Sequence, residues 1–588
     1  MFLSVISYLR RQPRANILAL ALLVVMSIFV VRLFYLQVVR HDYYLAIANA
    51  NQMSKFTIPA TRGEIYALSR GQPVPLVLNK TVYLMFADPS EVDDPEELKS
   101  AVRQVAGGDL IEGSLGSLDD DSLHYVVLAR AINGDQAKLL KSKQIAGLGF
   151  KETTERVYPE GGLAAQTLGF VDANGQGQYG VEQSLNGQLA GRTGLLKTVT
   201  DVRNIPLTIG DNNIRQPAVD GQDIVLSIDR NIQAKVEAVL AKGLKHANAH
   251  HGSVVVMDPN TGKVMAMANL PTFDPANYAK TTDYADFSND VVSSPYEPGS
   301  VMKTLSVGIG IASGAISKNS TYDNTNKIQV DGETINNSAV DPRIPDATVT
   351  DILHYSLNTG VVWTLKQMGG GEVNDKARQT LYNYYHDNFR LGRVTGIEQA
   401  GEQAGIIYKP NEGFGRNVRY ANMTFGQAMS VTMIQFAAAF SAEINGGTYY
   451  QPSVVAGWLE DDGTLKPKPA KSLGQSISRK DSLTMRRLIH KATMAGTFGS
   501  VAPDGYNIGG KTGTAQKIDP ETGKYSMEYN QTTGSYVGFG GTDTPRYVIM
   551  VRVMDPNIPG YAGTEAAAPI FNDISNWMIN YLRLPPNK

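Results

Sequence analysis

Three short motifs supply the residue types needed for acyl transfer, and they follow one another along the chain. Ser300 stands three residues before Lys303 in the only Ser-x-x-Lys of the sequence, and Lys511 opens the only Lys-Thr-Gly. Between them, Ser356 and Asn358 form a Ser-x-Asn triplet. A serine hydroxyl becomes a nucleophile when a neighbouring base removes its proton, and an uncharged lysine can be that base. The set therefore predicts an enzyme that transfers acyl groups through a serine.

Ser300 is expected to lie at the start of a helix. Glu297-Pro298-Gly299 interrupts the chain just before it, and residues 301–312 form an apolar, helix-compatible run. A helix start favours developing negative charge, and Lys303, three positions on, lies on the same face. Burial among apolar neighbours would disfavour the ammonium form of Lys303 and let it accept the serine proton. Taken alone, the pair would more often mark an ordinary lysine in the first turn of a buried helix.

The Ser-x-Asn motif is chosen by position from three such triplets. Ser184-Leu185-Asn186 lies far upstream, and Ser317-Lys318-Asn319 follows the nucleophile helix too soon to fold back across its mouth. Ser356-Leu357-Asn358 instead interrupts two helical stretches, 350–355 and 359–368, so its polar side chains can project from a loop. The alternative, to which we give equal weight, is that the polar residues of this triplet only cap a helix.

The third motif is expected on a strand. Lys511 is a fixed cation, Thr512 and Thr514 offer hydroxyl groups, and Gly513 lets a substrate backbone come close. An extended peptide could bind along the edge of this strand by adding one more strand to the sheet.

The elements that must position these motifs predict an α+β catalytic domain built on an antiparallel sheet. The expected strands are 253–257, 263–267, 509–517, 534–539 and 547–553. Apolar residues recur at helical spacing after Pro569, so a C-terminal helix packs on the sheet. The block from about 300 to 500 is mostly helical and lies on or beside the sheet.

The N-terminal residues contain a candidate membrane anchor, expected over 17–39. Ile17 to Val31 are apolar except for Ser27, and apolar residues resume after Arg32. Arg32 is expected to snorkel or to face a partner helix. The arginines within residues 1–16 place that segment in the cytoplasm and everything after the anchor outside. A cleaved signal peptide is the competing interpretation, but no small-residue cleavage site follows Val31.

The remaining chain is predicted to divide near residue 220. Residues 40–220 show mixed strand and helix patterns without a catalytic cluster, typical of a spacer or docking pedestal. Residues 221–588 are long enough for one large core. The turn-forming Gly210-Asp211-Asn212-Asn213 and the strand-like Asp223–Asp229 set this boundary.

Composition excludes several other functions. The 54 basic and 56 acidic side chains leave no basic surplus for nucleic-acid binding. The chain has no cysteine, which excludes disulfides, a thiolate nucleophile and cysteine metal sites. The eight histidines lack His-Glu-x-x-His spacing, so a zinc hydrolase is not expected. His354, two residues before Ser356, is expected on a helix surface without a role.

The three motifs together resemble those of the penicilloyl-serine transferase superfamily. Further stretches resemble the class B penicillin-binding proteins from the anchor to the C-terminal helix. In the pedestal they are Thr61-Arg62-Gly63-Glu64-Ile65, Arg156-Val157-Tyr158-Pro159 and Gly177–Glu182; in the catalytic part they are Asp258–Gly262, Glu297-Pro298-Gly299 and Ala567–Phe571. Ala67–Arg70 departs from the family, which usually has Asp-Arg there. The resemblance implies a penicilloyl-serine transferase fold, with a five-stranded sheet flanked by helices, behind a mixed α/β pedestal of the dimerisation type.

The resemblance also implies roles for the motif residues. Ser300 would attack the penultimate D-Ala carbonyl of a peptidoglycan stem peptide ending in D-Ala-D-Ala, with Lys303 as base. Ser356 would relay a proton to the leaving amine, and Asn358 would hold the substrate amide. Lys511 with Thr512 and Thr514 would bind the terminal carboxylate. The backbone N–H groups of Ser300 and Thr514 would form the oxyanion hole.

Penicillin binding and cell-wall cross-linking follow from the same resemblance. β-Lactams would acylate the serine, no metal or organic cofactor is needed, and a polytopic glycosyltransferase of the SEDS type is the expected membrane partner, with Arg32 and Gln37 as contacts. The pedestal lacks the Glu-rich glycosyltransferase module of class A proteins, which predicts a monofunctional transpeptidase. The compact pedestal and Gly177–Glu182 favour a division role over elongation.

Four rival functions fit the sequence less well. A D,D-carboxypeptidase or β-lactamase would hydrolyse the acyl-enzyme, but an anchor and a long pedestal suit a cross-linking enzyme that works at a distance. A membrane β-lactam sensor would need a larger cytoplasmic part. A non-enzymatic scaffold of the wall complex is disfavoured by three intact motifs.

Overall fold

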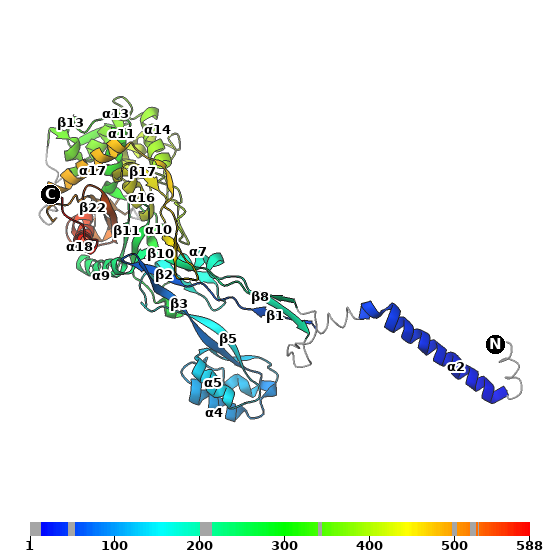
Figure 1. The fold of residues 1–588 in the computed structure, drawn as a ribbon. Coiled ribbons are helices and arrows are strands. Elements are labelled where there is room, and N and C mark those ends of the chain that lie inside the picture. The colour runs from blue at the N-terminus through cyan, green and yellow to red at the C-terminus, as the bar shows by residue number, and fades with distance from the viewer. Residues whose placement is uncertain are drawn as a thin grey trace. The chain divides into compact units, whose positions relative to one another are not determined.

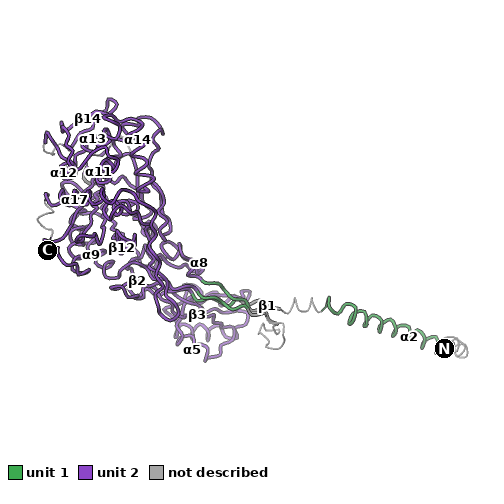
Figure 2. The backbone as a smooth tube through the Cα atoms, turned by 45° about the horizontal axis from the view of Figure 1, so that its top comes forward, with its two compact units in different colours: residues 1–61, 191–220 green, residues 62–190, 221–588 purple. Residues whose placement is uncertain are grey.

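The computed structural model describes residues 13–44, 53–199, 214–338, 344–496, 503–517, 525–526 and 528–587. The chain divides into two compact units (Figure 2). The first comprises residues 1–61 and 191–220, and the second comprises residues 62–190 and 221–588. The turn expected at 210–213 and the arginines at 10 and 11 lie outside the described residues.

The first unit contains the predicted apolar helix. Helix α2 (Pro13–Phe34) continues as a π-helical turn, η1 (Tyr35–Val39). Residues 14–39 are long and apolar enough to cross a membrane, with a mean hydropathy of 2.8. The same unit holds a three-stranded antiparallel sheet of β1 (Met53–Ile58), β8 (Gly194–Val199) and β9 (Ile214–Gln216).

The pedestal part of the second unit has the expected mixed α/β character. Its strands are β2 (Ile65–Ser69), β3 (Gln72–Ala87), β4 (Val126–Ile132) and β5 (Leu148–Val157), and its longer helices are α4 (Pro95–Ala106) and α5 (Gly134–Ser142). The long strand β3 pairs with β2, β4 and β5. The side chains of Asp94 and Asn133 cap the N-termini of these two helices. They accept hydrogen bonds from backbone N–H groups of the first turn, which have no partner within the helix.

A buried ion cluster ties together the three pedestal stretches that resemble class B proteins. Glu182 is fully buried and accepts from Arg62 Nε at 2.8 Å and from Arg156 Nε at 3.0 Å. Asn79 bridges the two arginine segments through Arg156 and the Arg62 carbonyl oxygen. A buried carboxylate is tolerated only when it is paired in this way, so losing either arginine would leave an uncompensated charge.

The five predicted strands of the catalytic part form one antiparallel sheet, as expected. They are β11 (His251–Met257), β12 (Val264–Leu270), β21 (Gly509–Gln516), β22 (Thr532–Gly541) and β23 (Pro545–Met554). The spatial order is β12-β11-β23-β22-β21. Two strands from early in the domain therefore lie beside three from its end, with the motif strand β21 at the edge.

Helices cover both faces of this sheet (Figure 1). Val255, Met550 and Val537 lie opposite one another on three neighbouring strands and face the helical block. Their sequence neighbours Val254 and Val551 face the other side, against α9 (Arg230–Ala247) and α18 (Ala568–Tyr581). The alternation follows from the two-residue period of a strand, and both faces are apolar because both are covered.

The helical block contains the nucleophile helix and its neighbours. Its helices are α11 (Met302–Ala312), α12 (Val349–His354), α13 (Asn358–Met368), α14 (Asp375–Tyr382), α15 (Arg416–Met423), α16 (Met433–Ile444) and α17 (Arg479–Met494). Short antiparallel pairs accompany them: β13 (Thr321–Asp323) with β16 (Asp346–Thr348), β14 (Lys327–Val330) with β15 (Glu333–Asn336), and β17 (Thr448–Tyr450) with β20 (Ser472–Gln475). Helices α11 and α16 are apolar almost all round, as befits buried helices.

Strand β10 (Asp223–Asp229) lies in the pedestal sheet. It pairs in parallel with β2 and antiparallel with β18 (Val455–Leu459), and β19 (Leu465–Pro467) extends the same sheet. Residues from three distant parts of the chain thus share one sheet. The boundary at residue 220 stays a prediction.

Glu443 is a buried carboxyl group that makes the folding stability depend on pH. It is fully buried on α16, and a Cβ atom at Gly308 of α11 would lie 2.4 Å from its carboxyl oxygen. Burial raises its pKa to about 8, against a smaller lowering by the Thr304 hydroxyl. The folded protein therefore holds a proton that the unfolded chain releases above its ordinary pKa of 4.5, and stability falls by about 1.4 kcal/mol per pH unit between these values.

We expect Glu443→Gln to remove this slope. The variant should gain about 3 kcal/mol at pH 7, seen as a higher melting temperature of the detergent-solubilised chain, and nothing near pH 4.5. An equal gain at both pH values would contradict the account.

Candidate active site

The nucleophile turn packs directly against the motif strand. Ser300 lies in a 3-10 turn, η6 (Gly299–Val301), that leads into α11. Gly299 has φ +64°, and a Cβ atom there would lie 2.8 Å from the carbonyl oxygen of Thr514. A Cβ atom at Gly513 would lie 2.7 Å from the carbonyl oxygen of Pro298. Both glycines are needed because turn and strand approach each other without room for side chains.

Lys303 reaches from the nucleophile helix to the second motif. Its side chain is 1% exposed, and Nζ donates to the Ser356 carbonyl oxygen and, at 3.1 Å, to Ser356 Oγ. Ser300 precedes it by one helical turn and is half-buried. The structure thus brings Lys303 and Ser356 into contact across 53 residues of sequence.

The Ser356 turn has an unusual backbone. Ser356 follows the end of α12 and has φ +58°. This is the left-handed region, which is energetically unfavourable for any residue that carries a Cβ atom. Asn358 is the first residue of α13, and its Nδ2 donates to the Asn336 carbonyl oxygen at 2.9 Å. The side chain of Asn358 is thereby engaged with β15 rather than capping the helix.

The two other Ser-x-Asn triplets lie away from this site. Ser184 belongs to the pedestal part, and its hydroxyl donates to the Glu398 carbonyl oxygen at 3.0 Å. Ser317 is exposed and bonds to Ser320 within its own turn. Neither of these serines contacts Lys303 among the interactions of the described residues.

The motif strand β21 presents Lys511 and the threonines beside the nucleophile turn. Lys511 is 6% exposed, and its Nζ donates to the Thr512 carbonyl oxygen at 3.1 Å. Thr514 Oγ1 accepts the Gly563 N–H at 3.1 Å, so this hydroxyl keeps its own proton to donate to a ligand. Within the described part of the chain β21 pairs only with β22, which leaves its other edge open for an added strand.

Several supporting residues were not singled out from the sequence. Glu297 accepts the Ala428 N–H at 2.8 Å and the Tyr525 hydroxyl at 3.3 Å, and burial raises the pKa of its carboxyl group. Tyr296 lies 3.0 Å from Ser535 Oγ, and the guanidinium of Arg552 covers its ring. The only sequence signal was the Glu-Pro-Gly stretch before Ser300, because Ala428, Tyr525 and Ser535 lie 131, 228 and 239 positions away from the residues that they contact.

His354 lies at the end of helix α12 and takes part in a contact that the sequence did not indicate. The side chain is half-buried between helices, and Nδ1 lies 2.8 Å from the Ala492 carbonyl oxygen on α17. Helix α12 packs on α17, so the face that carries His354 is partly covered.

A serine at a helix start, a buried lysine one turn later and a Lys-Thr-Gly-Thr edge strand define a serine acyl-transferase of the penicilloyl-serine type. Comparison with known proteins agrees. Residues 252–576 match the family described as the penicillin binding protein transpeptidase domain, and residues 57–226 match the penicillin-binding protein dimerisation domain. The chain belongs to the class B penicillin-binding proteins, as the motifs predicted.

Individual relatives match along nearly the whole chain. Stage V sporulation protein D of Bacillus subtilis is 30% identical over 573 residues, which cover 96% of this chain and 85% of that protein. Peptidoglycan D,D-transpeptidase FtsI of Escherichia coli is 27% identical over 581 residues, covering 98% and 92%. The crystal structure of penicillin-binding protein 3 from Mycobacterium tuberculosis, complexed with aztreonam, has a TM-score of 0.67 and 25% identity, covering 91% and 98%.

Proposed function

We propose that this protein is a peptidoglycan D,D-transpeptidase that cross-links stem peptides through an acyl-enzyme on Ser300. The observation that carries the proposal is the contact of the buried Lys303 Nζ with Ser356, beside a nucleophile turn that packs against β21. A lysine held in this way loses hydration and has a hydroxyl to exchange protons with, as a base needs.

The first half of the proposed reaction forms the acyl-enzyme. Lys303 takes the proton of Ser300, whose Oγ attacks the carbonyl carbon of the penultimate D-Ala. The N–H groups of Ser300 and Thr514 stabilise the oxyanion. The C–N bond then breaks while Ser356 gives its proton to the leaving nitrogen and takes the proton held by Lys303. The terminal D-Ala departs as the free amino acid, and Lys303 is neutral again.

Substrate orientation in this scheme comes from the strand. The stem peptide lies along the open edge of β21, Lys511 with Thr512 and Thr514 holds its terminal carboxylate, and Gly513 admits its backbone. Asn358 holds the substrate amide. In the second half, the amine of another stem peptide attacks the ester carbon, forms the cross-link and returns the proton to Ser300.

The lifetime of a penicillin adduct separates this function from hydrolytic alternatives. Intact-mass measurement after mixing with benzylpenicillin should show one adduct that persists for many minutes. Rapid loss of the adduct would indicate a β-lactamase, and complete absence would overturn the serine acyl-transfer mechanism.

We further infer how the protein is placed in the cell. Arg14 lies in the first turn of the apolar helix, which supports a cytoplasmic N-terminus and an extracytoplasmic catalytic domain in a single-pass arrangement. The compact pedestal supports septal synthesis, with elongation as the alternative.

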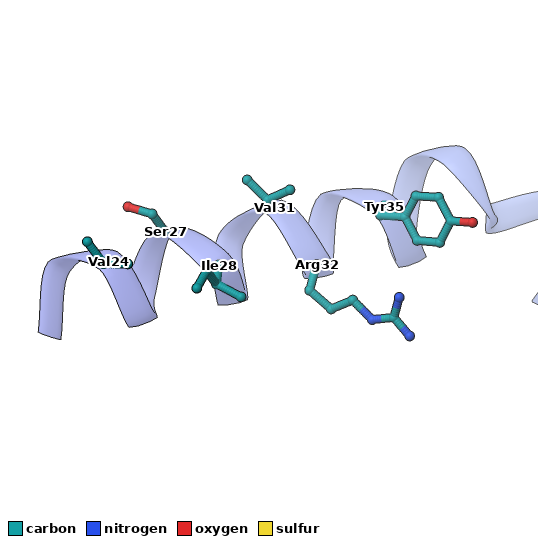
Figure 3. Close-up of a pocket in the computed structure, with 6 residues that line it drawn as sticks. All are labelled: Val24, Ser27, Ile28, Val31, Arg32 and Tyr35. Atoms are coloured by element: carbon teal, nitrogen blue, oxygen red, sulfur yellow. The ribbon is translucent and has the colours of Figure 1, made fainter. Parts of the chain in front are cut away.

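The anchor helix is proposed to contact a polytopic glycosyltransferase of the SEDS type. Val24, Ser27, Ile28, Val31, Arg32 and Tyr35 line a shallow groove along it (Figure 3). The guanidinium of Arg32 lies 5.6 Å from the Tyr35 ring centre, which leaves its N–H groups to donate to a partner. A charged side chain within an apolar span is retained when a partner satisfies it.

We expect Arg32→Leu with Gln37→Leu to weaken association about tenfold, since intramembrane polar contacts contribute roughly 1–2 kcal/mol. Co-purification from detergent with the tagged glycosyltransferase measures this, and Val30→Leu, which keeps the helix apolar, is the control. Unchanged association in the double variant would count against the contact.

A further inference from the structure

His354 links the Ser356 turn to helix α17. It is the last residue of α12, and because the Ala492 carbonyl can only accept, Nδ1 must carry the proton in their 2.8 Å bond. Its ring also contacts Tyr355 edge-on, with 4.4 Å between ring centres. The bond therefore attaches the end of α12 to α17 just before the chain turns toward Ser356.

The turn that follows needs such support. Ser356 adopts the left-handed conformation, and its carbonyl oxygen and hydroxyl both accept from Lys303. The turn itself is held by Tyr355 N–H on the Asp351 carbonyl at 2.9 Å and Leu357 N–H on the Ile352 carbonyl at 3.0 Å. A strained serine persists only where its surroundings hold it in place.

The next residue on α17 holds the motif strand. Thr493 Oγ1 accepts the N–H of Gly510 at 2.9 Å, one residue before Lys511. His490 Nδ1 lies 2.7 Å from the Ile508 carbonyl oxygen and anchors the segment that leads into the strand. Adjacent residues of one helix, Ala492 and Thr493, therefore fasten the second motif on one side and the third motif on the other.

We propose that His354 is a positioning residue, whose bond to Ala492 sets the spacing between the Ser356 turn and the Lys511 strand through α17. The proposal rests on the proposed acyl transfer at Ser300. It assigns His354 no proton transfer in the reaction, because neutral and protonated imidazole can both donate from Nδ1. The bond instead keeps Lys303, Ser356 and the substrate-seating strand in register, and misplacement of reacting groups by a fraction of an ångström slows chemistry steeply.

The test compares two substitutions in the detergent-solubilised full chain. His354→Asn keeps an N–H donor near the position of Nδ1–H, whereas His354→Leu fills similar space without one. The acylation rate constant and the dissociation constant of the preceding complex are measured separately with benzylpenicillin. We expect His354→Leu to lower the rate constant about tenfold with the dissociation constant little changed, and His354→Asn to restore most of it.

A matched control separates positioning from general destabilisation. Tyr547→Phe deletes a buried hydroxyl that lies 2.8 Å from Ser575 Oγ on the far face of the same sheet. It should lower the melting temperature at least as much as His354→Leu and leave acylation unchanged. Wild-type acylation by His354→Leu, or an asparagine variant as slow as the leucine variant, would overturn the proposal. A changed shape of the pH–rate profile would also overturn it, since that would indicate acid–base chemistry at His354.

Amide hydrogen exchange tests the positioning without any catalysis. His354→Leu should speed exchange at Tyr355 and Leu357, whose N–H groups hold the turn, while Gly510 stays protected by Thr493. Unchanged exchange at Tyr355 and Leu357 would overturn the proposal. A wild-type protein that forms no penicillin adduct would instead refute the acyl-transfer function, and the exchange result would still decide the role of His354.

Discussion

We expect Ser300→Ala to form no covalent adduct with benzylpenicillin and to lose transpeptidation by on the order of 10⁵-fold or more, as enzymes do without their nucleophile. The close approach of Gly299 to Thr514 seats residue 300 beside the motif strand, so the alanine variant loses the hydroxyl at that position. Intact mass reports the adduct, and release of D-Ala from a stem-peptide substrate reports turnover. The noncovalent affinity for penicillin should change little, since the surrounding groups remain.

Ser313→Ala provides the matched control for this variant. Ser313 follows the other end of α11, and its hydroxyl donates to the Gly310 carbonyl oxygen within its own turn. It should acylate like the wild type. If Ser300→Ala still gained the mass of benzylpenicillin, the nucleophile would be another residue and the mechanism would have to be abandoned.

We expect Lys303→Met to slow acylation by about 10³–10⁴-fold, the usual contribution of a positioned general base. Methionine follows the path of the lysine stem but cannot accept the serine proton or donate to Ser356. Time-resolved adduct formation with benzylpenicillin measures the rate constant.

Lys303→Arg tests whether residue 303 acts as a base or through its charge. Arginine keeps the charge and the hydrogen-bond donors but cannot lose its proton at neutral pH. It should acylate as slowly as the methionine variant. An arginine variant within tenfold of the wild type would show that residue 303 acts through its charge and not as a base.

The sequence predicted the parts of the site that are written in consecutive residues. The nucleophile helix, the motif strand and the five catalytic strands could be predicted because a helix, a strand and a Ser-x-x-Lys turn each depend on residues a few positions apart. The choice of Ser356 among three triplets also needed only the order of helices along the chain. In the structure this serine is the one that contacts Lys303.

The hydrogen bond of His354 could not be predicted for a related reason. The sequence places His354 on a helix, but nothing in the neighbouring residues indicates a partner for its ring. Its acceptor, the carbonyl oxygen of Ala492, lies 138 positions away in the sequence. Every residue has a backbone carbonyl, so the residue types give no indication that this one is the acceptor.

By itself, the sequence determined the chemistry, the anchor and the class of fold, since these depend on residue types and on periodicities of two and 3.6 residues. The tertiary structure alone decided which distant segments meet. It placed β10 in the pedestal sheet beside β18. It brought the Ala428 N–H and the Tyr525 hydroxyl within hydrogen-bond distance of the Glu297 carboxylate. It also made α17 the helix that contacts both the second and the third motif. Such contacts depend on the packing of whole elements against one another, and local sequence carries no information on which backbone groups that packing will bring together.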